Sequence, residues 1–309
     1  MDEFTLESID RVEVICRRWL PLGEPRAAVV VVHGASEHSG RYARLAEVLQ
    51  GHGFAVYALD LRGHGRTANS TGRGRIGPSG MPGVIADVEA LVRRARGELG
   101  ECPVVLLGHS MGSVIAQAFV EEHGEEVDAY VLSGTMGAVP EAAELASAVR
   151  QAVDAGLADE PLDALAGFND AFEPARTPYD WLSRDADEVD QYIADPLCGD
   201  DLPLTYGFVA AMLDTVATAM EAEQIARVPT RLPVLLLTGE ADPVSNGSTH
   251  VRELEQRLRA AGLDVVAQYY PDARHEVFNE TNRDAVHRDL VDWLNRVSAL
   301  GAGSPHESR

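Results

Sequence analysis

The stretch from Pro103 to Phe119 constrains the fold of this chain more than any other. It begins with a continuous apolar run, Val104 to Leu107, which predicts a buried strand. Gly108-His109-Ser110-Met111-Gly112 follows, and then apolar residues recur with helical spacing. A G-x-S-x-G sequence between a strand and a helix predicts a sharp turn that raises the Ser110 hydroxyl above the strand ends. Glycines flank the serine because neighbouring backbone passes close by, and the next helix directs free N–H groups at the turn.

The rest of the chain alternates strand and helix patterns, which favours a mostly parallel sheet flanked by helices. Continuous apolar runs predict buried strands at residues 27–32, 54–59, 127–132, 233–237 and 265–270. Helices are predicted at 41–51, 82–99, 249–261 and 279–297, a loop at 67–82, and an edge strand at 10–20. Ligands bind to open α/β sheets at the carboxyl ends of the strands, so the loops at that edge form the candidate site.

The alternation of strands and helices stops between residues 139 and 206. From Glu141 to Asp201 this segment contains 16 Asp or Glu and three Arg, and its pattern is helical. Because it is too long for a connecting loop, we expect a helical insertion over the sheet edge. The chain is therefore divided into a first core part at 1–138, a cap segment at 139–206, a second core part at 207–298 and a disordered tail at 299–309.

Composition excludes several classes of partner. The net charge of −23 argues against nucleic acids and anionic membrane surfaces. No apolar stretch reaches the roughly 20 residues that span a bilayer, and the N-terminus lacks the features of a signal peptide. The three cysteines, Cys16, Cys102 and Cys198, are far apart and form no metal-binding pattern. We expect a cytoplasmic protein with reduced thiols.

A serine nucleophile requires a base, and the base requires a carboxylate that orients it. On a sheet of this kind the expected chain order is Ser, acid, His. Asp242 follows the strand at 233–237, and His275 lies in the loop after the strand at 265–270, so both reach the sheet edge that carries Ser110. Glu240, two residues before Asp242, remains the alternative acid.

The other candidates for the base or the acid are weaker. Four histidines lie inside predicted helices, at a helix end, or at the elbow with the side chain expected to point away: His250, His287, His123 and His109. The turn from Asp60 to Gly65, D-x-R-G-H-G, also follows a strand. Structural roles are expected for its charged and imidazole side chains.

Together, these motifs resemble those of the monoacylglycerol lipase and lysophospholipase-like branch of the α/β-hydrolases. The resemblance runs from about Val12 to Val297, and the H-G-x-x-E-H-x-x-R-Y loop together with H-E-x-x-N-E is far more specific than the elbow alone. Seven stretches carry it, the sixth and seventh being similar to bacterial members: His33–Tyr42, Asp60–Gly65, Gly108–Gly112, Gly239–Asp242, His275–Glu280, Trp181–Asp185 and Asp195–Cys198.

The resemblance implies an α/β-hydrolase fold and a Ser110–Asp242–His275 triad. It also implies an oxyanion hole formed by the backbone N–H groups of Ala35 and Met111. Further residues are implied to hold the surrounding loops: His33, Gly34, Glu37, Arg41, Tyr42 and His109. No metal or organic cofactor is expected. Some relatives carry a cysteine after the acid, whereas Pro243 to Asn246 contains none, so thiol sensitivity is not carried over.

The expected function is hydrolysis of a carboxylic ester, monoacylglycerol lipase-like or a related carboxylesterase or lysophospholipase, on a small molecule with an acyl chain. Alternatives are an acyltransferase, thioesterase or amidase using the same triad, because one fold hosts many chemistries. A non-enzymatic binding protein on this fold is the least expected. Serine at the elbow, in place of aspartate, argues against dehalogenases and epoxide hydrolases. Transient contact of the cap with a lipid surface is expected, and its acidity predicts a preference for neutral esters.

Overall fold

The structure of the chain is a computed structural model that describes residues 1–301. Its centre is an eight-stranded sheet with the order β1-β2-β4-β3-β5-β6-β9-β10. The strands are β1 (Asp2–Glu7), β2 (Glu13–Trp19), β3 (Ala28–Val32), β4 (Ala55–Leu59), β5 (Val104–His109), β6 (Ala129–Ser133), β9 (Val234–Gly239) and β10 (Val265–Tyr270). From β4 to β10 all neighbours are parallel, whereas β2 is antiparallel to both β1 and β4.

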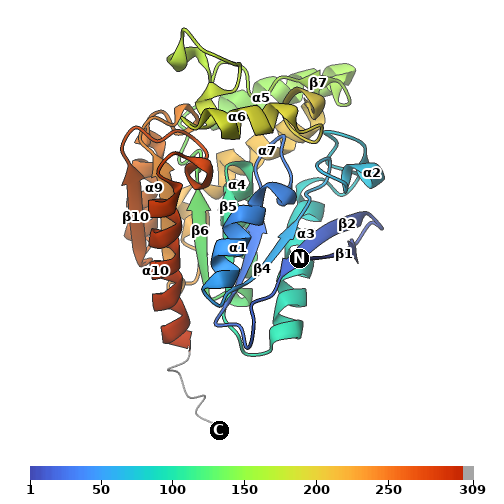
Figure 1. The fold of residues 1–309 in the computed structure, drawn as a ribbon. Helices are drawn as coiled ribbons and strands as arrows, with labels where there is room; N and C mark the ends of the chain where they lie inside the picture. Colours follow the sequence, from blue (N-terminus) through green and yellow to red (C-terminus); the bar gives the residue numbers. More distant parts are fainter. Residues whose placement is uncertain (302–309) are drawn as a thin grey trace.

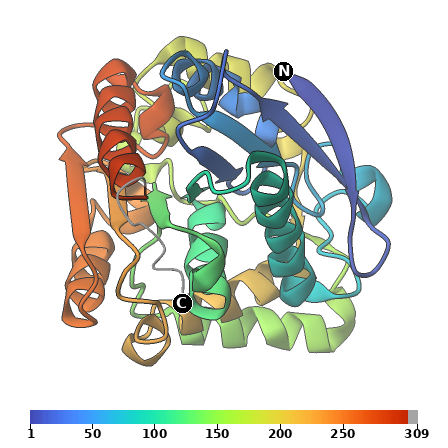
Figure 2. The same ribbon diagram turned by 90° about the horizontal axis from the view of Figure 1, so that it is seen from below.

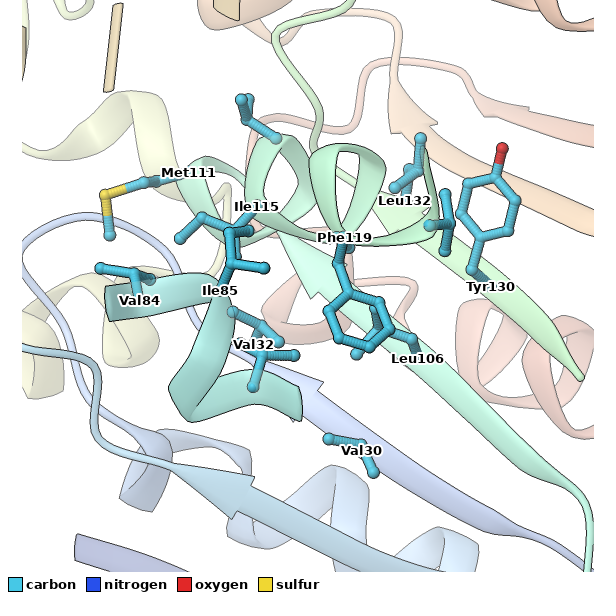
Figure 3. Packing of buried hydrophobic residues seen from close by; sticks show 14 of the residues in the cluster. Val30, Val32, Val84, Ile85, Leu106, Met111, Ile115, Phe119, Tyr130 and Leu132 are labelled. Atoms are coloured by element: carbon cyan, nitrogen blue, oxygen red, sulfur yellow. The ribbon is translucent and has the colours of Figure 1, made fainter. Parts of the chain in front are cut away.

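Helices cover both faces of this sheet (Figures 1 and 2). One face carries α1 (Ala43–Gly51) and α10 (Arg283–Gly301), and the other carries α3 (Gly80–Leu99), α4 (Met111–His123) and α9 (Thr249–Ala260). Alternate residues of each buried strand point to opposite faces: Val29 and Val31 pack in one cluster, and Val30 and Val32 in the other. Figure 3 shows part of the cluster that contains Val30 and Val32, packed between β3, β5, α3 and α4. The predicted α/β-hydrolase fold is confirmed.

The strand order explains where the site lies. From β3 the chain crosses through α1 to β4 on one side, and from β4 it crosses through α3 to β5 on the other side of β3. Parallel strands joined in this way require crossovers on opposite faces, so the loops after β3 and β5 diverge and leave a crevice at their carboxyl ends. Ser110 directly follows β5 at this crevice.

The cap segment lies over the carboxyl ends of the strands, at the top of Figure 1. Its helical prediction is correct for α5 (Ala142–Ala152) and α6 (Ala186–Ala194). Between them the chain forms single turns, and the two-residue strand β7 (Pro161–Leu162) pairs with β8 (Leu204–Thr205). The predicted boundary at 206 coincides with the start of α7 (Tyr206–Ala219), which packs against α5 and is followed by α8 (Ala222–Ile225). The domain division itself stays a prediction.

Short turns of helix connect many of these elements. They are η1 (Ser39–Tyr42), α2 (Ala68–Thr71), η2 (Gly124–Glu126), η3 (Val153–Leu157), η4 (Asp170–Phe172), η5 (Asp180–Leu182), η6 (Gly199–Asp201), η7 (Pro243–Ser245) and η8 (Val277–Asn279). The turn α2 lies inside the segment expected to be a loop.

Two sequence predictions about the ends of the chain were wrong. The edge strand is β1, because Phe4 and Leu6 alternate with polar residues and pair with the strand that was expected to form the edge. The final helix continues to Gly301, past the predicted start of a tail at 299, and residues 302–309 of that predicted tail lie outside the described residues. Within residues 1–301, no helix combines the length and the apolar character needed to cross a membrane.

Candidate active site

Ser110 occupies the turn between β5 and α4 in a strained backbone conformation. Its φ of 53° and ψ of −121° lie in a region that residues with a side chain rarely adopt. The glycines make the turn possible: a Cβ on Gly108 would lie 2.2 Å from the carbonyl oxygen of Gly112, and a Cβ on Gly112 would lie 2.1 Å from that of Val32. The side chain of Met111 is buried in the cluster of Figure 3 near Val84, which leaves only its backbone at the turn.

The structure brings His275 and Asp242 together at the same sheet edge. His275 Nδ1 lies 3.0 Å from Asp242 Oδ2, and both side chains are buried. Asp242 caps the turn η7, where its other carboxylate oxygen accepts a hydrogen bond from Val244 N at 2.9 Å. Glu240 is exposed and pairs with Arg252, so it is not the carboxylate that contacts the imidazole.

The environment of His275 favours the charged imidazolium. Burial lowers its pKa, but the charge and the hydrogen bond of Asp242, together with the charges of Glu276 and Glu37, raise it further, so the pKa lies above the ordinary histidine value. His109, expected to point away from the site, instead packs against His275 with ring centroids 4.9 Å apart. Burial and the neighbouring His275 lower the pKa of His109 to about 4, so it stays neutral near neutral pH.

The loop after β3 is fixed by buried charges. Gly34 N donates to Glu37 Oε1 at 2.6 Å, and Tyr42 donates to the same oxygen at 2.8 Å. Arg41 bridges Glu37 and Glu276, which connects this loop to the residue after His275. Burial alone raises the pKa of Glu37, but the charge of Arg41 lowers it well below its usual range. Gly34 lies against the nucleophile elbow, because a Cβ there would be 3.0 Å from Ser110 Cβ.

His33 joins the loops after β3 and β4. Its Nδ1 donates to Gly34 O at 2.8 Å, and its Nε2 accepts from Leu61 N at 2.9 Å, so the ring is a neutral connector. Asp60 accepts hydrogen bonds from Arg17, Ser39 and Arg66 N, and Arg62 pairs with Asp10 and Asp87. The structural roles expected for the D-x-R-G-H-G turn match these contacts.

The cap segment contributes side chains that the sequence did not single out. The Trp181 ring lies 5.0 Å from the His275 ring, and Trp181 O accepts from His275 N at 3.4 Å. Leu182 O accepts from Glu276 N at 2.8 Å. On the opposite side, Tyr192 donates to the carbonyl oxygen of Ser36 at 2.9 Å. Each contact joins residues more than 90 positions apart, which no local pattern reveals. The resemblance covered Trp181 and Leu182, in the stretch Trp181–Asp185, whereas no signal in the sequence pointed to Tyr192.

Most acidic groups of the cap face solvent. Of the 16 Asp and Glu side chains from Glu141 to Asp201, 12 are exposed. Buried Glu188 pairs with Arg44, and Asp195 lies 2.9 Å from His38 Nε2. Three of the exposed carboxylates line a hollow in the cap that Trp181 also lines: Asp163, Glu173 and Asp200. Part of the negative surface therefore borders the side chain that covers His275.

Two clusters among the described residues have the ligand types and spacing of a metal site, but their chemistry does not fit one. In the first, His38 Nδ1 accepts from Gly40 N, so Nε2 carries the proton shared with Asp195 and offers no lone pair; the third member is Cys198. Burial raises the pKa of that thiol far above its usual value. The second consists of Glu89, His123 and Glu126, whose carboxylates both pair with the guanidinium of Arg93.

Comparison with known proteins agrees with this geometry. The family described as serine aminopeptidase, S33, matches residues 23–282. The monoacylglycerol lipase of Mycolicibacterium smegmatis is 31% identical, and the alignment covers 94% of this chain and 96% of the relative. Human monoglyceride lipase is also 31% identical, with 97% and 93% covered.

The solved structures that this chain resembles include an esterase and a lipase. A thermostable carboxyl esterase from Bacillus coagulans in complex with glycerol has a TM-score of 0.90 and 28% identity, covering 96% of this chain and 98% of the other. A lipase in an open form has a TM-score of 0.88 and 30% identity, covering 96% and 99%. The predicted resemblance is thus confirmed, and the chain belongs to the serine aminopeptidase S33 family of α/β-hydrolases.

Proposed function

We propose that this protein is a serine hydrolase that cleaves carboxylic esters through an acyl-enzyme on Ser110, with neutral monoacylglycerols as its preferred substrate class. One observation carries the proposal: the buried pair of His275 and Asp242 lies at the carboxyl ends of the strands, the sheet edge at which Ser110 is held in a strained elbow. The relatives named monoacylglycerol lipase and carboxyl esterase support the ester as substrate.

The mechanism follows from the tautomer of His275. Its Nδ1–H donates to Asp242, so Nε2 has a free lone pair and takes the proton of Ser110 Oγ as that oxygen attacks the ester carbonyl. The tetrahedral intermediate collapses, and the alcohol leaves with the proton from Nε2. Water then loses a proton to Nε2 and attacks the acyl carbon, and release of the acid restores Ser110.

The negative charge of the intermediate is assigned to the backbone N–H groups of Ala35 and Met111. Met111 N belongs to the first turn of α4, where N–H groups have no partner within the helix. Ala35 lies next to Gly34, which contacts the elbow. Such donors typically contribute a factor of about 100 to 1,000 each in turnover. In this proposal His33, Gly34, Glu37, Arg41 and His109 hold the loops that present these groups.

The proposal extends to the role of the cap, the compartment and the type of acyl transfer. The cap at 139–206 selects the acyl chain and makes transient contact with lipid surfaces, and the enzyme acts in the cytoplasm without a metal or organic cofactor. Acyl transfer, thioester cleavage and amide cleavage use the same triad. Product analysis with added glycerol or alcohol distinguishes hydrolysis from transfer, and a series of p-nitrophenyl esters of increasing length beside monoacylglycerols defines the substrate.

The direct test is Ser110→Ala. We expect turnover of esters to fall by at least ~10³-fold, since binding and the oxyanion hole alone supply the remainder. The protein should stay folded, and a fluorophosphonate probe should no longer label it. Ser147→Ala, which removes an exposed hydroxyl on α5, is the matched control and should retain full activity and labelling. Near-normal ester turnover in folded Ser110→Ala refutes the proposal.

A further inference from the structure

The cap segment binds the backbone beside the proposed oxyanion donor. The carbonyl oxygen of Ser36 accepts two hydrogen bonds from the cap, one from the Tyr192 hydroxyl at 2.9 Å and one from Gly199 N at 3.0 Å. The Ser36 hydroxyl donates to Leu202 O at 3.0 Å. Residue 36 is thus held from both its backbone and its side chain by elements more than 150 positions away.

Ala35 lies between two anchored neighbours. On one side Gly34 N donates to Glu37 Oε1, and on the other the Ser36 carbonyl is held by the cap. Ser36 itself has a φ of 53°, a left-handed conformation that is unfavourable for a serine and persists only where the surroundings enforce it. The peptide unit that carries the Ala35 N–H is held at its carbonyl end, where Gly34 O accepts from His33 Nδ1 at 2.8 Å, and the backbone that leaves Ala35 is held at Ser36 O by the cap. Loosening the second anchor frees the backbone torsions of residues 35 and 36, and through them it shifts the Ala35 N–H.

Tyr192 is built to deliver this one hydrogen bond. The residue is 2% exposed, so water does not readily replace the bond when it is lost. Its ring is held independently of the hydroxyl, because the guanidinium of Arg41 lies 4.8 Å from the ring centroid and the Tyr179 ring lies 5.0 Å away. Removal of the hydroxyl alone should leave the ring in place.

We propose that Tyr192 is a positioning residue for the oxyanion hole: its hydroxyl, delivered by the cap, fixes the Ser36 carbonyl and thereby aims the Ala35 N–H at the developing oxyanion. The inference rests on the proposed ester hydrolysis and adds to it that the cap sets the rate of the chemical step as well as covering the site. A bond of this kind acts on the transition state, so its loss lowers kcat without weakening substrate binding.

The test compares Tyr192→Phe with Tyr269→Phe. Tyr269 on β10 is the control because its hydroxyl also donates one hydrogen bond, to Glu255 of α9 at 2.7 Å, and this bond lies outside the cap. Loss of an entire oxyanion donor costs about 100- to 1,000-fold, so a donor that is present but less firmly aimed should cost on the order of 10-fold in kcat. We expect this fall for Tyr192→Phe with KM unchanged, and less than about 2-fold for the control.

A second readout isolates the oxyanion. An alkyl trifluoromethyl ketone forms a hemiketal when Ser110 Oγ adds to its carbonyl carbon, which places negative charge on the carbonyl oxygen while the serine proton passes to His275. The inhibition constant for Tyr192→Phe should rise by the same factor as kcat falls, because both report the transition-state geometry. The concentration of active enzyme in each variant is determined by fluorophosphonate titration. The assays run well below each variant's Tm, so that partial unfolding does not cause a false decrease in kcat.

The outcomes separate the two proposals. Wild-type ester hydrolysis that Ser110→Ala abolishes establishes the reaction, and its absence refutes the proposed function. Given that reaction, Tyr192→Phe with unchanged kcat and inhibition constant overturns the positioning role alone. A rise in KM at constant kcat, a lower Tm with normal kcat, or equal defects in both phenylalanine variants also overturns it.

Discussion

Asp242→Asn is the substitution for which the structure gives the sharpest expectation. Asp242 Oδ1 accepts from Val244 N at 2.9 Å, and Oδ2 contacts His275 Nδ1 at 3.0 Å. An asparagine at this position must keep its carbonyl oxygen towards Val244 N, since the alternative orientation sets two donors against each other. Its NH₂ group then faces His275 Nδ1 and donates to it.

This reversal fixes the wrong tautomer. With Nδ1 as acceptor, the proton moves to Nε2, and that nitrogen no longer accepts the proton of Ser110. In the serine protease that serves as the template for such triads, the equivalent change lowers turnover by about 10⁴, or roughly 5 kcal/mol in activation free energy. We expect a defect of that size at neutral pH. Because the carboxylate charge is also lost, the pKa of His275 should fall, and the acid limb of the pH profile should move to lower pH.

The assay is kcat/KM for a p-nitrophenyl ester across the pH range, beside Glu240→Gln. Glu240 is an exposed carboxylate two residues away that pairs with Arg252, so its loss should change activity by less than about 2-fold. Circular dichroism and Tm check that both variants are folded. A larger defect in Glu240→Gln, or a mild one in folded Asp242→Asn, means that the orienting acid is misassigned.

Two further predictions concern charge. In the proposed mechanism the neutral imidazole of His275 is the base. Because the pKa of His275 is raised, kcat/KM should increase with pH through a limb that lies above about 6.5, and a limb below that value contradicts the environment of His275. The acidic surface beside Trp181 should make an anionic ester a poorer substrate than a neutral ester of equal length. Added salt should reduce the difference in kcat/KM between the two esters. The electrostatic field of a charged surface changes association rates by ~10- to 1,000-fold, and it fades within a Debye length of about 10 Å at 0.1 M salt. If the ratio of kcat/KM for the neutral and the anionic ester does not change with salt, the preference comes from side chains that line the site and not from the acidic surface.

The sequence predicted those parts of the molecule that follow from local rules. Buried strands were recognisable from their apolar runs, and the strand over 265–270 begins and ends where predicted. Ser110, Asp242 and His275 were identified because each follows a strand, and all parallel strands deliver their next residue to one edge. Their catalytic roles stay predictions, whereas the contact between Asp242 and His275 is present in the structure.

Contacts between the cap and the core could not be predicted from the sequence, because they join residues that are far apart in the chain. Tyr192 meets Ser36 across 156 positions, and nothing near either residue encodes the encounter. The left-handed φ of Ser36 was equally hidden, since serine does not favour that conformation. The strand β1 was missed because only Phe4 and Leu6 mark it, and its pairing partner had already been placed at the edge.

The hydrogen bonds from the cap to both active-site loops limit how this protein can be redesigned. Exchange of cap segments between related hydrolases is an obvious way to alter chain-length preference, on the view that the cap is an interchangeable module. Here a graft that replaced residues 179–202 would also remove the partners of Ser36, His275 and Glu276. The side chain of Asn169 accepts from Trp181 N at 3.0 Å, so a graft that reaches η4 would also disturb the partner of His275. Grafts confined to α5 and η3 leave all of these contacts intact, and we expect selectivity to be changed there with the least effect on turnover.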